Sequence, residues 1–455
     1  MKNLAVVIAG LLVLTGCSSV ETEDVSYSLG IVENVEDTRP SDDDVLVEVT
    51  PSTDEGELEP VDAPIVEEEV VQEDVQVSEP RETETALPEP SEAPIIEEPA
   101  VSFVSNLSNF ASPVETCKIQ QTNRIGYENK GFPHIGGIPH LGTVNVAIVA
   151  MDFENAQGSG SVSAKFGHIE EKLESWSKKW SFGKMAYEVQ IHDGWIRAPK
   201  GAEWYNCPEC HGEGVRKQSD AESLAQIIQA IDPYYNLAGI DFIGIIVPPK
   251  ANEEYFFGIY GLKSASTDEG RQSFATFGGL GIQEGISLWD LWIHEILHFQ
   301  GFVGHGPGNG VGYGVMQNQW GPSKAVNLWE GFVATWYGAN EVACIDATDI
   351  DDNLYVELGS IDSFGSDYEG LVIKLNNEEV LVVEHRKVYG SEILAYKVNI
   401  NAPTYRDDRG GYVADEKNWW YYLRESDGNV RIDKSVSFGG VTIKNLGDGR
   451  LEISR

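Results

Sequence analysis

The chain contains few basic residues, few cysteines and no apolar run long enough to span a bilayer. Its 455 residues include 32 Lys and Arg against 73 Asp and Glu, and only five cysteines. A net charge of −41 argues against a nucleic-acid partner, because phosphates bind basic surfaces. A transmembrane helix needs about 20 apolar residues, whereas the apolar run near the N-terminus covers only residues 4–14. We therefore expect no nucleic-acid partner and no membrane-spanning helix.

The first residues are typical of a bacterial lipoprotein signal. Lys2 precedes the apolar run, and the letters LTGC end it at Cys17. A short apolar run of this kind is typical of an exported chain, and a cysteine at its end favours lipid attachment. We expect residues 1–16 to be a signal peptide and Cys17 to carry the lipid. Because Ser18 follows rather than Asp, the resemblance to Gram-negative lipoproteins favours the outer membrane or the cell surface.

Residues 17–100 lack tryptophan and phenylalanine and have almost no basic side chains. They contain 27 Asp and Glu but only two basic residues, Arg39 and Arg81. Proline recurs, as in the stretch PEPSEAPIIEEPA. Such a composition buries too little apolar surface to offset the entropy of ordering the chain. We expect a disordered, extended tether, and we interpret its acidity as solvation and spacing.

Residues 101–455 differ from the tether, because they contain all eleven tryptophans and a smaller charge excess, 46 acidic against 29 basic residues. A segment of this length can build a large core in one elaborated domain or two packed units. Up to about residue 344, apolar runs and helical spacing alternate, which predicts strands and helices in turn. Later runs, such as EVLVVEHRKV, predict antiparallel strands. The expected strands are 143–153, 185–192 and 240–249, and the expected helices are 163–180, 219–232, 288–299 and 322–339.

The stretch WIHEILHFQGFVGHG, residues 292–306, contains the pattern H-E-x-x-H. Residues four apart share one face of a helix, so His294 and His298 can bind one metal ion. Glu295 follows the first histidine, where it can take a proton from a water that zinc has acidified. The flanking Leu and Ile side chains indicate a buried helix, and buried histidines need partners. The pattern predicts a zinc site with Glu295 as the general base.

A catalytic zinc generally has three protein ligands and an open position, and the third ligand is the open question. In the long motif H-E-x-x-H-x-x-G-x-x-H, Gly301 fills the glycine position, but Gly304 stands where the ligand is expected. Gly301 should end the helix in a left-handed conformation. A bulge at Gly304 would bring His305 to the metal, so we predict His305 as the third ligand. Glu330, in the next expected helix, and a water molecule are the alternatives.

Two residues downstream also fit a zinc site. Met316 lies in GVGYGVMQNQWG, residues 310–321, at the spacing at which metzincin-like peptidases place a methionine in a tight turn below the metal. A methionine after a glycine-rich loop is otherwise common as core filler. Tyr313 could donate a hydrogen bond to an oxyanion, although a packed tyrosine is the simpler interpretation.

Besides Cys17, the chain has four cysteines, Cys117, Cys207, Cys210 and Cys344. In an exported protein they are compatible with two disulfides in three pairings. We favour Cys207–Cys210 with Cys117–Cys344, because the first two are neighbours. The stretch CPECHGEG also matches the C-x-x-C-H haem-attachment pattern and one zinc repeat of J-domain chaperones. Because a second such pair is missing and the stretch separates a strand from a helix, we interpret it as a disulfide-closed loop without haem.

Several stretches, in this order, resemble the immune-inhibitor-A type of secreted metallopeptidase. The resemblance covers roughly residues 130–400 and implies a zincin catalytic domain that hydrolyses peptide bonds. His294, Glu295, His298 and Met316 match the family's motif directly, and His305 matches it with a shift of one residue. The family also binds calcium, for which we can map no ligand set here. The stretches are FPHIGGIPHLGTVNVAIVAMDFENA, WSKKWSFGKMAYEVQIHDGWIRAP, AIDPYYNLAGIDFIGIIVPP, HEILHFQG, GVMQNQWGPSKAVNLWEGFVATWYG and, with a Glu-x-Arg motif, EVLVVEHRKVYGSEILAYKVN.

We therefore expect an α+β fold. Residues 101–344 should form a zincin-type catalytic domain, a twisted sheet plus an active-site helix, and residues 345–455 an antiparallel β unit. The expected function is a membrane-tethered zinc endopeptidase with one zinc ion, which hydrolyses peptide bonds of extracytoplasmic proteins. The alternative is an inactive zincin-type surface lipoprotein that binds protein or glycan, which the shifted third ligand favours. Glu295 disfavours this alternative, because a pure binding protein does not need that carboxylate.

Overall fold

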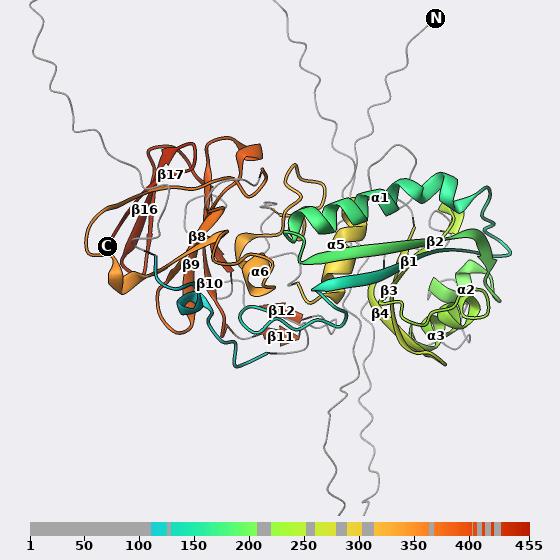
Figure 1. Ribbon diagram of the computed structural model, residues 1–455. Helices are drawn as coiled ribbons and strands as arrows, with labels where there is room; N and C mark the ends of the chain where they lie inside the picture. Colours follow the sequence, from blue (N-terminus) through green and yellow to red (C-terminus); the bar gives the residue numbers. More distant parts are fainter. Residues whose placement is uncertain are drawn as a thin grey trace, which may run out of the picture. The chain divides into compact units, whose positions relative to one another are not determined.

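The structure is a computed structural model (Figure 1), and it describes most of the chain from residue 111 onward. All the described residues belong to one compact unit. Among them, no helix combines the length and the apolar character that crossing a bilayer requires. The described ranges are 111–124, 129–206, 220–251, 260–278, 289–302, 314–363, 368–402, 404–406, 412–414, 420–422 and 429–455. The predictions outside these ranges concern the signal peptide, the tether, Cys17, Cys207, Cys210, His305 and Tyr313.

A five-stranded mixed sheet forms the first part of this unit, with the strand order β2-β1-β3-β5-β4. The strands β2, β1, β3 and β5 run parallel, and β4 is antiparallel to β5 at one edge. Parallel neighbours need crossover connections, and α1 connects β1 to β2 while α3 lies between β2 and β3. The elements are β1 Gly142–Asp152, α1 Val162–Trp180, β2 Met185–Arg197, α2 Ala202–Asn206, α3 Asp220–Ile231, β3 Phe242–Ile246, β4 Tyr260–Thr267 and β5 Gly270–Phe277.

Helices cover both faces of this sheet, which explains why β1 is almost continuously apolar. The even-numbered side chains of residues 144–150 join the core that contains α1 and α5 (Trp289–Phe299). The odd-numbered side chains of residues 147–151 join the core that contains α2 and α3. Successive side chains of a strand point to opposite faces, so both sets are buried, and Figure 1 shows α1 and α3 on opposite sides of β1. The predicted strand at 143–153 and helix at 163–180 are confirmed.

The later strands form two sheets that share a core. The six-stranded sheet has the order β13-β10-β9-β8-β6 with β14 beside β10, and all its pairs are antiparallel except β6 with β8. The four-stranded sheet β15-β16-β17-β7 is antiparallel. Leu371 and Leu381 of the first sheet belong to the same buried cluster as Ile443 and Ile453 of the second. Such a pair of buried faces is the packing of a β-sandwich.

The run EVLVVEHRKV, which predicts a strand, contains the observed strand β9. A two-stranded ribbon, β11 with β12, completes the strands. The strands are β6 Val342–Asp346, β7 Leu354–Glu357, β8 Gly370–Lys374, β9 Glu379–His385, β10 Ile393–Asn399, β11 Thr404–Arg406, β12 Tyr412–Ala414, β13 Trp420–Tyr422, β14 Asn429–Val430, β15 Ser435–Phe438, β16 Val441–Gly447 and β17 Arg450–Ser454. The remaining helices are α6 Leu328–Val333 and the 3-10 helices η2 Val114–Cys117, η4 Ala347–Asp349 and η5 Lys387–Tyr389.

The six-stranded sheet also packs against the core that contains the helix α5. Val372 and Val382, on its second face, belong to the same cluster of buried residues as Ile293 and Trp329. Both faces of β9 are therefore buried, which explains its nearly continuous apolar sequence. The segments before and after residue 344 thus share one core, and β6 itself contains that residue.

The α+β class is confirmed, and the structure corrects the helix expected at 322–339. The observed helix α6 covers only Leu328–Val333, because a capping box of Asn327 and Glu330 starts it five residues after Pro322. The backbone reaches a left-handed conformation at Thr335, where φ is 60°, and the helix has ended by then. The sequence also does not predict the hairpin of β4 and β5, whose strands are rich in Ser, Thr and Gly.

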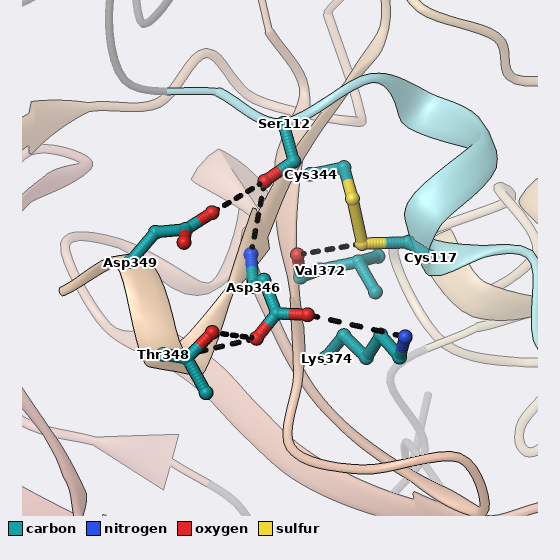
Figure 2. Close-up of a disulfide and its surroundings, with 8 residues drawn as sticks. All are labelled: Ser112, Cys117, Cys344, Asp346, Thr348, Asp349, Val372 and Lys374. Atoms are coloured by element: carbon teal, nitrogen blue, oxygen red, sulfur yellow. Dashed lines mark hydrogen bonds and ion pairs between the residues drawn. A yellow bond between two sulfur atoms is a disulfide. The ribbon is translucent and has the colours of Figure 1, made fainter.

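A disulfide ties the segment that enters this unit to β6 (Figure 2). It joins Cys117 to Cys344 across 227 residues of sequence, and both cysteines are buried. Next to it, the hydroxyl of Ser112 donates to Asp349 and accepts from the backbone N–H of Asp346, each at 3.2 Å. The predicted pairing of Cys117 with Cys344 is confirmed.

Replacing both cysteines, Cys117→Ser with Cys344→Ser, should lower the free energy of unfolding by about 2–5 kcal/mol, because an open chain gains more conformational entropy on unfolding than a cross-linked one. Urea unfolding under oxidising conditions measures the change. Reduced wild type is the control and should match the double variant. Equal stability of the oxidised wild type and the variant would contradict this role of the cross-link.

Candidate metal centre

The helix α5 carries the H-E-x-x-H pattern, and an aromatic contact fixes it on the five-stranded sheet. The indole of Trp292 stacks on Phe277 of β5, with ring centroids 3.9 Å apart and an angle of 7° between the planes. Beneath it, Gly244 of β3 leaves room for the ring, because a Cβ at this position would lie 2.1 Å from Trp292. The sheet therefore sets the rotation of α5 about its own axis, and with it the direction of the two histidines.

The imidazoles of His294 and His298 face each other on α5. Their ring centroids lie 4.6 Å apart at an angle of 88°, and their Nε2 atoms are 3.1 Å apart. The Nδ1 atom of His294 lies 3.0 Å from the carbonyl oxygen of Val315. A carbonyl only accepts hydrogen bonds, so Nδ1 carries the proton and Nε2 keeps its lone pair. Such a partner for the second nitrogen fixes the tautomer and the orientation of a metal-binding histidine.

These two histidines fit a shared zinc ion. Two Zn–N bonds of about 2.0–2.1 Å at a tetrahedral angle hold the nitrogens about 3.3–3.4 Å apart, which is close to the 3.1 Å between the Nε2 atoms. Imidazole is also a ligand that suits zinc. Among the residues that the structure describes, no third His, Cys, Asp or Glu forms a group with the two imidazoles within 4.8 Å. The described part of the chain thus supplies two candidate ligands.

Glu295 follows His294 on α5, and only 1% of its surface is exposed. Its neighbours Ile293 and Ile296 belong to the hydrophobic core. A carboxylate on such a helix costs free energy unless another group compensates its charge.

The helix α5 ends as its glycine predicts. Gly301 has a φ of 89°, and its N–H donates to the carbonyl of His298 while the N–H of Phe302 donates to the carbonyl of Leu297. This pair of bonds is the Schellman motif. A Cβ on Gly301 would lie 2.0 Å from the carbonyl oxygen of Ile135, so the position requires glycine for both its conformation and its space. The predicted left-handed end of the helix is confirmed.

A loop from residues 129 to 138 holds this end of α5, which the sequence did not indicate. The side-chain N–H groups of Asn129 donate to the carbonyls of Gly301 and Ile135, at 2.5 and 2.6 Å. The N–H of Gly137 donates to the carbonyl of Phe299 at 2.7 Å. The bond to Phe299 satisfies one of the carbonyls that a helix leaves unpaired at its C-terminus. Glycine and proline in FPHIGGIPHLG indicate a loop, but nothing in that pattern reveals its partner.

Met316 lies in a tight turn beside the first histidine. The N–H groups of Gln317 and Asn318 both donate to the carbonyl of Gly314, at 3.1 and 2.8 Å. Met316 itself is fully buried in the core that contains α5. The preceding residue, Val315, provides the carbonyl that orients His294. The structure thus brings together the methionine turn and the histidine helix that the sequence indicated separately.

Glu330, the alternative third ligand, is not brought to the histidines. Its carboxylate accepts from the backbone N–H of Asn327 at 3.3 Å and caps its own helix α6. Burial raises the pKa of Glu330 to about 8, and the hydrogen bond from the backbone of Asn327 only partly offsets this rise. We infer that Glu330 is a neutral acid near pH 7 that holds the start of α6 and lies against the methionine turn.

The described residues contain one group of three acidic side chains, Asp232, Asp268 and Glu269, that could hold a cation. Two of the three are exposed, and burial together with repulsion from its neighbours raises the pKa of Asp232. Exposed acidic groups gather in this way without binding ions. No other feature of this surface points to a ligand, so we assign no site to it.

The Glu330→Gln variant should lose part of the pH dependence of folding stability. The pKa of about 8 in the folded protein exceeds the usual carboxyl value of 4.5. The stability that the protonated carboxyl contributes is therefore complete below pH 4.5 and is lost as the pH rises through about 8. Free energies of unfolding, measured between about pH 5 and 9, should fall with pH more steeply for the wild type than for the variant.

The matched control is Glu188→Gln, which alters an exposed carboxylate on β2. Its pH profile should run parallel to that of the wild type. A parallel profile for Glu330→Gln as well would show that Glu330 titrates normally and would contradict the neutral form.

No protein-family model matches this chain, and no curated protein matches it. The case for a function therefore depends on the residues themselves and on their geometry.

Proposed function

We propose that this chain is a zinc-dependent endopeptidase that hydrolyses peptide bonds of extracytoplasmic proteins. The observation that carries the proposal is the pair of imidazole Nε2 atoms 3.1 Å apart on α5, one of them oriented by the carbonyl of Val315, with the buried Glu295 between them in sequence. This set of donor atoms suits zinc and a general base. In this proposal a lipid on Cys17 anchors the enzyme, and the acidic tether separates it from the membrane.

The residues proposed to hold the ion are His294 and His298, with His305 as the third ligand. When bound, zinc supplies a Lewis acid that lowers the pKa of a water molecule and polarises a peptide carbonyl. The bond from Nδ1 of His294 to Val315 fixes the tautomer in which Nε2 keeps its lone pair, which could then bind the ion. Gly301 ends the helix in a left-handed conformation, four residues before His305 in the sequence.

Glu295 is proposed to move the proton. Its carboxylate accepts a proton from the attacking water and then passes it to the nitrogen of the leaving amine. The apolar surroundings of α5 exclude bulk water, and a water-poor site strengthens electrostatic interactions with developing charge. The twisted sheet, α5 and the methionine turn are consistent with the zincin type of catalytic domain that the sequence resembles.

The Glu295→Gln variant should keep about one zinc per chain and should lose peptide hydrolysis by about 10²–10⁴-fold, the usual contribution of a general base. Metal analysis and cleavage of a casein-type substrate measure the two properties. Glu188→Gln, on the exposed face of β2, is the control and should behave as the wild type. Undiminished cleavage by Glu295→Gln would refute the mechanism, and zinc binding without any cleavage by the wild type would favour the inactive binding scaffold.

The His305→Ala variant tests the third ligand. It should weaken zinc binding by more than about 100-fold, because even the loss of an outer-shell partner costs about 10–100-fold. Competition with a chelator at fixed pH measures the affinity. The matched control is His168→Ala, which removes an exposed histidine from α1. A variant that retains both zinc affinity and cleavage would exclude His305 as a ligand.

A further inference from the structure

The orientation of His294 depends on a short peptide segment that another segment holds. The carbonyl of Val315 accepts from His294 Nδ1 at 3.0 Å, and the N–H of the same residue donates to the carbonyl of Ala325 at 3.0 Å. The residue whose carbonyl orients the histidine is therefore held through its own N–H by residue 325. Whatever positions the segment around Ala325 also positions the acceptor for His294.

The guanidinium of Arg386, directly after β9, holds that segment on both sides of Ala325. It donates to the hydroxyl of Ser323, to the carbonyl of Val326 at 3.1 Å and to Oδ1 of Asn327 at 3.0 Å. Only 1% of Arg386 is exposed. A planar guanidinium has donors in a fixed fork, so these contacts define both the place and the orientation of the segment.

Glu384, in β9 and two residues before Arg386, contacts the same segment. One of its carboxylate oxygens, Oε2, lies 3.3 Å from Nη2 of Arg386 and accepts from the N–H of Leu328 at 3.0 Å. Both side chains are almost completely buried. Buried ion pairs contribute little net stability, because desolvation offsets the attraction. Apart from the bond between the two side chains, their hydrogen bonds go to residues 323–328, which points to a positioning role rather than to general stabilisation.

We propose that Arg386, held by Glu384, is a positioning residue for the metal centre and acts on His294 through Ala325 and Val315. The inference deepens the proposed function, because it rests on His294 as a zinc ligand. It also gives a role to the Glu-x-Arg motif of the sequence, which reads Glu384-His385-Arg386. The β unit then serves the metal centre directly, since β9 and the residue that follows it supply the pair.

The test is the double variant Glu384→Gln with Arg386→Met. The single variant Arg386→Met leaves a buried carboxylate without its cation, a change that can prevent folding. The double variant removes both charges, retains an amide oxygen as acceptor for Leu328, and keeps a long side chain at position 386. The matched control is Lys397→Met, which removes a cation that pairs with Glu379 at 2.8 Å on the same sheet.

Two measurements detect a loss of positioning of His294 in the double variant. Zinc affinity, determined by chelator competition, should fall by about 10–100-fold in the double variant, the usual effect of losing an outer-shell partner. In the metal-free protein, the Nδ1–H of His294 should exchange with solvent faster than in the wild type, as nuclear magnetic resonance detects. Lys397→Met should change neither property, even where it lowers stability.

The outcomes separate this inference from the proposed function. Wild-type zinc affinity in a folded double variant, with unchanged Nδ1–H exchange, would overturn the inference and leave the peptidase proposal intact. A wild type that binds no zinc would refute the proposed function. The exchange of the His294 Nδ1–H would then still decide the positioning role, because unchanged exchange overturns it and faster exchange supports it.

Discussion

The contact between α5 and the five-stranded sheet is the constraint on which the rest of the candidate site depends. Trp292 stacks on Phe277 at 3.9 Å and lies over Gly244, where no side chain larger than hydrogen fits. A large aromatic side chain buried in a close-packed interior has almost no freedom to rotate or slide. Since residues of one helix move together, this contact sets the side of α5 on which His294 and His298 lie.

Around that helix, three segments that are far apart in sequence converge. The loop of residues 129–138 holds its C-terminal end, the turn at 314–318 orients the first histidine, and the pair at 384 and 386 fixes the segment that supports this turn. A metal ligand that must keep its direction needs such outer support, because a free imidazole rotates about two bonds. The five-stranded sheet, the six-stranded sheet and α5 share one buried core, and this core makes the support rigid.

The same region concentrates ionisable groups away from water. Glu330, Glu384 and Arg386 are all buried near the start of α6, and burial raises the pKa of both carboxyls. An apolar cluster would provide comparable stability at a smaller desolvation cost. Hydrogen bonds add a constraint on direction that aliphatic contacts lack, because each donor must point at its acceptor. We interpret the buried polar groups as the means by which the fold defines one arrangement of the turn and the helix.

The sequence by itself determined the α+β class, the buried strand at 143–153, the helix around residues 288–299, the left-handed end at Gly301 and the residues of the H-E-x-x-H pattern. These features are local: they follow from apolar periodicity, from the conformational freedom of glycine and from the spacing of side chains on one helix. The short α6, the β4–β5 hairpin, the role of Asn129 and the link from Arg386 to Val315 were decided only by the tertiary structure. Each depends on contacts between residues distant in the chain, and no local pattern records which distant group will accept or donate a given hydrogen bond.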